Sequence, residues 1–418
     1  MRATWGRWLN LLRNGFWFAP MLMLVLACAL ALVLLYVDER FDPGIKSKIA
    51  WAYSGGPAGA RSLLSTIAGS MITAASVTFS LASVALSIAS QQYGSRVLRN
   101  FMRDRITQVL LGTFVSTFIY SVLVVRAIRG SDVSGGFVPS ISVTVAIGLS
   151  LASLILLIYF IHHVSTSIQA SHIVRVIAED MEEAIPKLYP SRTGEPIEDL
   201  NEPGFRRGKE PLTVTIPKSG YLQMVDLDVL LAVATEEDLV IELIVKPGDH
   251  LVKSYGVARI WGTRKLNEQV LTRIVATFQV AGERTPTQDI RFQFQQLTDV
   301  VVRALSPGIN DPFTAINGID ELASAMLLLA ERTRVVRNRK DDNGVLRLTL
   351  LTPGLGEILN ATVGHIAIYG AADRFVMAGL RRVLDIVERY AHTGSEVETV
   401  GQLRKDLDRR EQENSSRD

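Results

Sequence analysis

Long apolar runs are confined to the part of the chain before residue 165. Four of them, at about 16–37, 62–94, 106–125 and 137–161, contain no Asp, Glu, Lys or Arg in their cores. Each is long enough for the roughly 20 residues that a helix needs to cross a bilayer. The pattern therefore predicts an α-helical polytopic membrane domain with four transmembrane helices, which begins with a span rather than with a cleaved signal peptide.

Small and hydroxyl-bearing residues recur through the second run at alternating spacings of four and three. A helix brings positions at this spacing onto one face. We call the stripe the seam, and its members are Ser62, Thr66, Gly69, Thr73, Ser76, Ser80, Ser83, Ser87, Ser90 and Gly94. The opposite side carries larger apolar residues such as Leu64, Ile67 and Met71.

The seam has two interpretations at this level. Hydroxyls without a fixed charge can line a water-filled path, and several copies around an axis would enclose a pore. Small residues also let two helices approach closely in lipid, so the seam can equally be a dry packing surface. Both interpretations predict a seam that faces protein or water rather than lipid.

After residue 161 the pattern predicts a different organisation. Helical spacing continues to about Pro186, which extends the last helix and sets the membrane domain at 1–185. A proline-containing linker at 186–211 precedes a small β-rich module at 212–264, a mostly helical domain at 265–411 and a disordered tail at 412–418. The expected fold is thus a helical membrane domain followed by an α+β cytoplasmic domain.

Arginines indicate the orientation. Three precede the first run, and four lie at 96–105 against one Asp. By the positive-inside rule both termini and everything after residue 162 are expected in the cytoplasm. Residues 186–418 carry 30 Lys and Arg against 33 Asp and Glu, so nothing there favours nucleic-acid binding.

A second motif lies between two predicted helices at 303–315, RALSPGINDPFTA. Free backbone N–H groups at a helix start can hold an anion. The candidate anion or ligand loop consists of Ser306, Gly308, Asn310, Asp311 and Thr314. The alternative is a tight turn in which Asn310 or Asp311 caps the next helix.

Signatures of catalysis and cofactor binding are absent from the sequence. Cys28 is the only cysteine, which leaves no internal disulfide and no cysteine metal site. No phosphate-binding loop, nucleophile elbow or zinc-protease motif occurs. We therefore expect no catalytic residues, no metal, no cofactor and no enzymatic activity.

The seam segment FSLASVALSIASQQYGSRVLRNFMRD and the 303–315 motif together resemble a family of predicted bacterial membrane proteins catalogued as a domain of unknown function. The resemblance covers nearly the whole chain. It implies a bacterial inner-membrane location and brings no activity.

The sequence leaves two functional hypotheses. The first is a homo-oligomeric channel or pore-like protein of the inner membrane, lined by the seam and regulated by its cytoplasmic domain. The alternative is a non-conducting membrane scaffold or sensor whose cytoplasmic domain binds a partner or small ligand.

Overall fold

The computed structural model describes residues 18–40, 53–93, 105–129, 137–167, 169–189, 210–262, 266–332, 338–391 and 394–416, apart from the side chains at 89–93, 167 and 415. Contacts between residues divide the chain into two compact units. Unit 1 comprises Met1–Gln169 and unit 2 comprises Ala170–Asp418. We describe each unit by itself.

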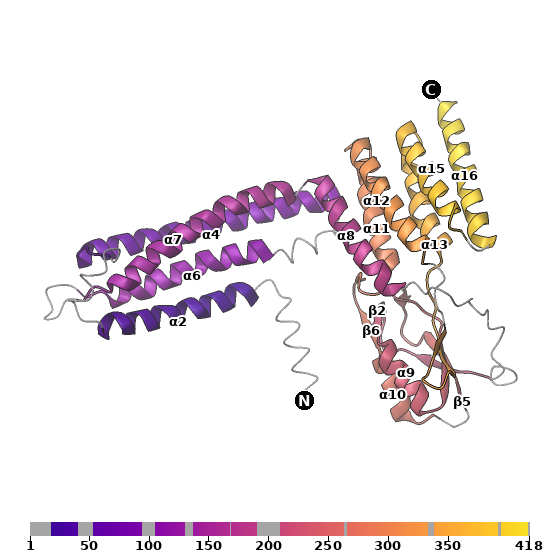
Figure 1. Ribbon diagram of the computed structural model, residues 1–418, viewed down its shortest axis with the longest axis horizontal. Coiled ribbons are helices and arrows are strands. Elements are labelled where there is room, and N and C mark those ends of the chain that lie inside the picture. The colour runs from indigo at the N-terminus through magenta and orange to yellow at the C-terminus, as the bar shows by residue number, and fades with distance from the viewer. Residues whose placement is uncertain are drawn as a thin grey trace. The chain divides into compact units, whose positions relative to one another are not determined.

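Unit 1 is helical. Its long helices are α2 (Phe18–Arg40), α4 (Pro57–Tyr93), α6 (Arg105–Ala127) and α7 (Ser140–Ser167). α6 contacts each of the other three, and its Leu110, Phe114 and Val124 are buried in their shared core (Figure 1). The predicted helical amino-terminal region is confirmed, and α6 rather than the seam helix is its centre.

Asp38 lies within a helix, just beyond the predicted end of the first span at about residue 37. α2 continues through Arg40, and the Asp38 carboxylate is buried against the start of α7. It accepts hydrogen bonds from the Ser142 backbone N–H at 2.9 Å and hydroxyl at 2.7 Å, and from the Ile141 N–H at 3.2 Å. A helix start supplies unpaired N–H groups, which make burial of this carboxylate favourable.

Among the described residues, five helices are long and apolar enough to cross a membrane by length and composition. Four are α2, α4, α6 and α7, and the fifth is α12 (Pro312–Ala330) in unit 2. Composition alone therefore does not confirm the predicted count of four spans.

The last helix of unit 1 does not run on to Pro186 as the spacing predicted. α7 ends at Ser167, and a separate helix, α8 (Ala170–Leu188), begins unit 2. The hydroxyls of Ser165 and Thr166 donate to carbonyls one turn back, at 2.8 Å and 3.0 Å. The Gln169 N–H donates to the Thr166 carbonyl, three residues back, at 3.2 Å, which departs from the four-residue hydrogen-bond ladder of an α-helix.

Unit 2 contains two sheets. The five-stranded sheet has the order β1 (Leu212–Thr215), β5 (Gly256–Gly262), β3 (Leu239–Leu243), β8 (Leu346–Thr349) and β7 (Asn338–Lys340). The three-stranded sheet has the order β4 (His250–Leu251), β2 (Gly220–Val225) and β6 (Phe278–Ala281). Two helices, α9 (Leu227–Glu236) and α10 (Glu268–Ala276), share their core, which includes Leu222, Leu230, Ile241 and Ile274.

The sheets correct the predicted module boundary at 264. β6, β7 and β8 all come from the segment that was predicted to be mostly helical. β8 pairs in parallel with β3, at Ile241 with Leu348. A parallel partner needs a long crossover connection, so local patterning could not show that these strands belong together.

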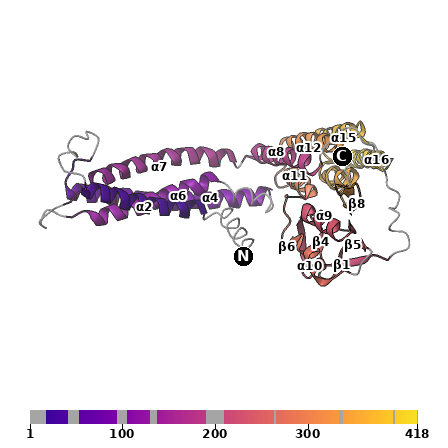
Figure 2. The ribbon, with the colours of Figure 1, turned by 60° about the horizontal axis from the view of Figure 1, so that its bottom comes forward.

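The remaining helices of unit 2 pack as a group beside the sheets (Figures 1 and 2). They are α8, α11 (Ile290–Ala304), α12, α13 (Leu355–Leu359), the π-helical η2 (Asn360–Gly364), α14 (His365–Gly370), α15 (Arg374–Glu388) and α16 (Gly394–Ser415). α12 contacts α8, α11 and α15. α16 extends to Ser415, so residues 412–415 are helical rather than a disordered tail; 417 and 418 lie outside the described residues. Most of the predicted linker, 190–209, also lies outside them.

Candidate functional site

The two faces of α4 differ in what they contact. One packs against α6 and α7, and its buried residues are Ala60, Leu64, Ile67, Ala68, Met71, Ala75, Thr78 and Ala85. Successive helical residues turn by about 100°, which puts the seam on the opposite side. Its described members are all exposed: Ser62, Thr66, Gly69, Thr73, Ser76, Ser80, Ser83 and Ser87. The Ser90 side chain and Gly94 lie outside the described residues.

Some seam hydroxyls are bonded within their own helix. Thr66 donates to the Ser62 carbonyl at 2.8 Å, Thr73 to Gly69 at 2.9 Å and Ser76 to Ile72 at 2.9 Å. These bonds satisfy the donors and leave acceptor lone pairs on each hydroxyl oxygen. The seam can therefore offer acceptors to water or ions, and it can also lie dry without an unsatisfied donor.

Apolar side chains flank the seam on both sides. Ile72 and Phe79 lie on one flank, with 44% and 58% of their surface exposed. Val77 and Val84 lie on the other, with 53% and 54% exposed. α4 thus has a packing face, a polar stripe opposite to it, and two apolar flanks between them.

The 306–314 loop is a compact turn. The Asn310 N–H donates to the Ser306 carbonyl at 2.9 Å, and Asn310 has a left-handed φ of 50°. The Ser306 hydroxyl donates to the Arg303 carbonyl at 2.6 Å. Gly308 is exposed, with nothing near its Cα on the side where a Cβ would stand. The polar groups of this loop mainly serve the turn itself.

Asp311, not Asn310, caps α12. Its carboxylate accepts from the Thr314 N–H at 3.1 Å and from the Thr314 hydroxyl at 2.6 Å. These hydrogen bonds hold the pKa of Asp311 below its ordinary value. The carboxylate takes the place next to the helix start where an external anion would bind, so the geometry favours the tight-turn interpretation.

An ion-pair cluster that the sequence did not indicate lies where the 246–249 turn meets the start of α11. Asp289, with 1% of its side chain exposed, is paired with Arg284 at 2.6 Å. Arg291 reaches Asp249 at 2.7 Å and Glu357 at 3.0 Å. Burial raises the pKa of Asp289 despite these arginines.

Gly248 allows the close approach at this cluster. Its φ is +92°, and a Cβ there would lie 2.0 Å from Asp289 Oδ2. Only glycine fits both the conformation and the space. Pro, Gly and Asp at 247–249 are typical turn residues, but no local pattern indicates the contact of Gly248 with Asp289, 41 residues later.

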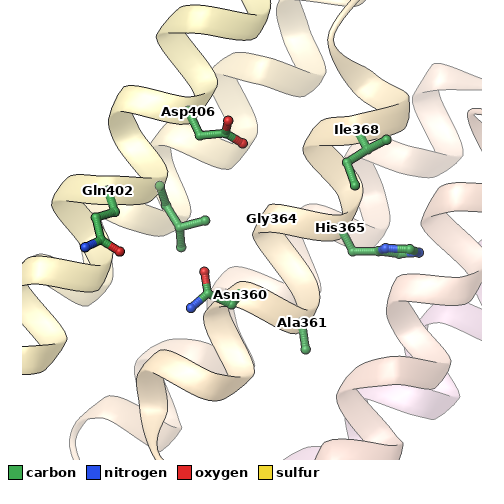
Figure 3. A pocket seen from close by; sticks show the side chains of 8 residues that line it. Asn360, Ala361, Gly364, His365, Ile368, Gln402 and Asp406 are labelled. Carbon is green, nitrogen blue, oxygen red and sulfur yellow. The ribbon is translucent and has the colours of Figure 1, made fainter.

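A cavity of about 410 Å³ lies between η2, α14 and α16 (Figure 3). Its polar lining includes Asn360, His365, Gln402 and Asp406. Asp406 is paired with Arg410 at 2.7 Å. π-helical segments are frequent at functional sites, and the amide groups here can hydrogen-bond a small polar ligand. No feature of the sequence indicates this cavity, because a π-helical segment has no distinct residue pattern.

Among the described residues no group of three or more His, Cys, Asp or Glu side chains could hold a metal ion. The charged side chains described above form ion pairs with one another.

Comparison with known proteins places the chain among relatives that share most of its length. Uncharacterized proteins of Mycobacterium tuberculosis and Mycobacterium bovis are each 30% identical over 383 residues, which cover 91% of this chain and 73% of each relative. No solved structure matches the chain. Residues 13–385 match the family described as "Predicted membrane protein (DUF2254)". The chain therefore belongs to this family of predicted membrane proteins, in agreement with the resemblance of its two motifs.

Proposed function

We propose that the protein is a homo-oligomeric channel or pore-like protein of the bacterial inner membrane, in which the seam of α4 lines the path and unit 2 is a cytoplasmic regulatory domain. One observation carries the proposal. All described seam residues are exposed on the side of α4 opposite to its packing face. The helices of unit 1 thus leave an uncharged polar stripe for something outside the protomer.

The flanks of α4 support an arrangement of several copies around an axis. In such a ring each lining helix contacts two neighbours and turns its remaining face to the lumen. Ile72 and Phe79 on one flank and Val77 and Val84 on the other supply apolar contacts for both neighbours. Hydroxyl oxygens between them can orient water and cations without a fixed charge.

The proposed topology has four spans, with both termini in the cytoplasm. The fifth candidate, α12, packs against α8, α11 and α15 within unit 2 and carries Asp320 and Glu321 near its middle. Its apolar residues thus have protein partners, as in a core helix. The arginines at 96–105 support the orientation.

Conductance tests the channel directly. Purified protein in planar bilayers should pass current. Ser80→Leu or Ser83→Leu should lower this current at least several-fold, because each replaces a hydroxyl in the lumen with a larger apolar side chain. Ile155→Leu, at an exposed position of α7 outside the seam and its flanks, is the matched control and should leave the current within about two-fold. Wild-type protein that passes no current in any salt would contradict the proposal.

A non-conducting scaffold or sensor is the second candidate. The in-helix bonds of Thr66, Thr73 and Ser76 favour it, because a seam with satisfied donors can pack dry against another helix. Unit 2 would then bind a partner or a small ligand, for which the cavity beside η2 is a candidate.

Thiol accessibility separates the two candidates. Cys28 is the only cysteine, so Cys28→Ser gives a background for Ser80→Cys. A wet seam should react with a charged, water-soluble thiol reagent in membranes, and the reaction should block current. A dry seam should resist the reagent and instead form disulfide-linked dimers on oxidation.

A further inference from the structure

Two neighbouring loops of unit 2 expose large apolar side chains. Ile309 and Phe313 belong to the turn between α11 and α12 and are 46% and 79% exposed. Tyr369 and Phe375 flank the turn between α14 and α15 and are 49% and 58% exposed. We call these four residues the loop-end surface. A Cβ at Gly370 would lie 3.4 Å from Leu305 Cδ1, so the two turns are adjacent.

The beginning of α8 lies at this same end of the helical group. Tyr189, just after α8, is close enough to Asp289 and Arg291 at the start of α11 for their charges to influence its pKa. α8 and α11 pack together, and the end of α8 lies near the start of α11. The two helices therefore run in opposite directions. The start of α8 accordingly lies beside the end of α11, which leads into the Ile309 turn; both views show α8 alongside α11 and α12 (Figures 1 and 2).

Chain connectivity keeps the start of α8 near a membrane surface. α7 has 28 residues, about 42 Å at 1.5 Å per residue, which matches a bilayer of about 40–45 Å with its headgroups. Only Ile168 and Gln169 separate Ser167 from Ala170. These steps span at most about 11 Å. In the proposed topology, in which α7 crosses the bilayer, the start of α8 is thus tethered within about 11 Å of the headgroup layer.

The chemistry of this end suits lipid. Aromatic rings with apolar neighbours are typical of the membrane interface. The Arg374 guanidinium lies 4.6 Å from the Phe375 ring centroid, where a cation can meet lipid phosphate while the ring enters the acyl boundary. Two carboxylates of these turns, Asp311 and Asp373, accept hydrogen bonds from helix-start N–H groups, which offset their charge.

We propose that the loop-end surface docks unit 2 on the bilayer, with Phe313 and Phe375 inserted among the headgroups of anionic phospholipid. The inference uses the membrane placement of α7 but not conduction, and it can fail while the channel proposal stands.

Spin-label accessibility in the full chain tests the docking. On the Cys28→Ser background, Phe313→Cys and Phe375→Cys each receive a nitroxide in vesicles of phosphatidylethanolamine and phosphatidylglycerol. Tyr255→Cys is the control, since Tyr255 is 62% exposed in the sheet part of unit 2. Collision with lipid-soluble oxygen, relative to a water-soluble nickel chelate, should be several-fold higher at 313 and 375 than at 255.

Two other outcomes would overturn the proposal. Equal ratios at the three positions would show that the loop-end surface lies in water. Low collision rates with both reagents at 313 and 375 would show that protein covers it. The label at 375 reports independently if the change at 313 disturbs the fold.

Discussion

α4 and α6 are two apolar helices of one unit that use similar residues in opposite ways. α6 places its hydroxyls inside: Thr113, Ser116, Thr117 and Ser121 are all buried. α4 places the hydroxyls of the seam outside, on the face that none of the described helices of unit 1 covers. Composition does not distinguish the two patterns, because both are mixtures of Ser, Thr and Gly with large apolar residues.

The glycines of the two helices make the difference concrete. At Gly112 in α6 an added Cβ would lie 2.7 Å from Met23 Sδ and 3.0 Å from Pro20 Cα in α2. At Gly69 in α4 it would meet nothing within 4 Å. Small residues in α6 let helices of one protomer approach closely, whereas those in α4 remain available to another molecule or to water.

The largest expected effect comes from filling the crowded glycine. Gly112→Leu should destabilise unit 1 by about 1–3 kcal/mol or more, because the backbone of α2 cannot move aside cheaply. Thermal unfolding in detergent, with a probe on unit 1, measures the loss.

Gly69→Leu is the matched control. It should leave unfolding of the detergent-solubilised protomer nearly unchanged and should act only on association or conductance. Equal destabilisation by both substitutions would break the comparison, since α4 would then be packed on both faces.

Removal of one hydroxyl should also destabilise the protomer more in α6 than in α4, but by a smaller amount than the glycine substitutions do. Thr117 and Ser153 hydroxyl oxygens lie 3.4 Å apart in the buried core, and Thr117→Val leaves that position without a hydroxyl. We expect a cost of about 1 kcal/mol. Thr73→Val, on the exposed seam, should cost the protomer almost nothing, and chemical denaturation of both variants tests this.

The smallest effect concerns pH and lies outside both helices. Burial, then Glu182 and Glu179, raise the pKa of Glu321 in unit 2. The neutral form is favoured in the folded state, so this stabilisation is full below about pH 4 and is lost as the pH rises through the raised value. Glu321→Gln should raise the unfolding midpoint by a few degrees at pH 7 and leave it unchanged near pH 4.

If Glu321→Gln changed the unfolding midpoint equally at pH 7 and near pH 4, the raised pKa of Glu321 would not be the cause of the change.

Periodicity in the sequence is sufficient to predict the helices of unit 1 and the seam, because apolar runs and small-residue spacing are local properties. Ile173, Ile177 and Met181 continue the helical spacing past residue 161, and all three are buried on one side of α8. Periodicity could not reveal that Asp38 is buried in α2 or that α7 ends at Ser167. The first feature depends on hydrogen bonds to Ser142, across 104 residues, and the second has no counterpart in the apolar spacing.

The candidate sites likewise fall into those that local sequence predicts and those that depend on contacts between distant segments. The cap at Asp311 follows from local capping rules, and the choice between Asn310 and Asp311 needed only the geometry of one turn. The Asp289 cluster and the η2 cavity join segments that are distant in sequence, such as Gly248 with Asp289 and Asn360 with Asp406. No local pattern marks them, because each depends on tertiary packing.

The bonds of Asp38 to the start of α7 also bear on how unit 1 can move. Three further contacts lie at that end: Tyr120 to the Ser142 carbonyl at 3.0 Å, Arg61 to the Ile128 carbonyl at 2.8 Å, and the Tyr53 N–H to the Thr144 hydroxyl at 2.8 Å. Together these hydrogen bonds connect the four helices of unit 1 at one end. If a force acted on unit 1 through α8, the helices would separate at the opposite end, and the hydrogen-bonded end would stay fixed.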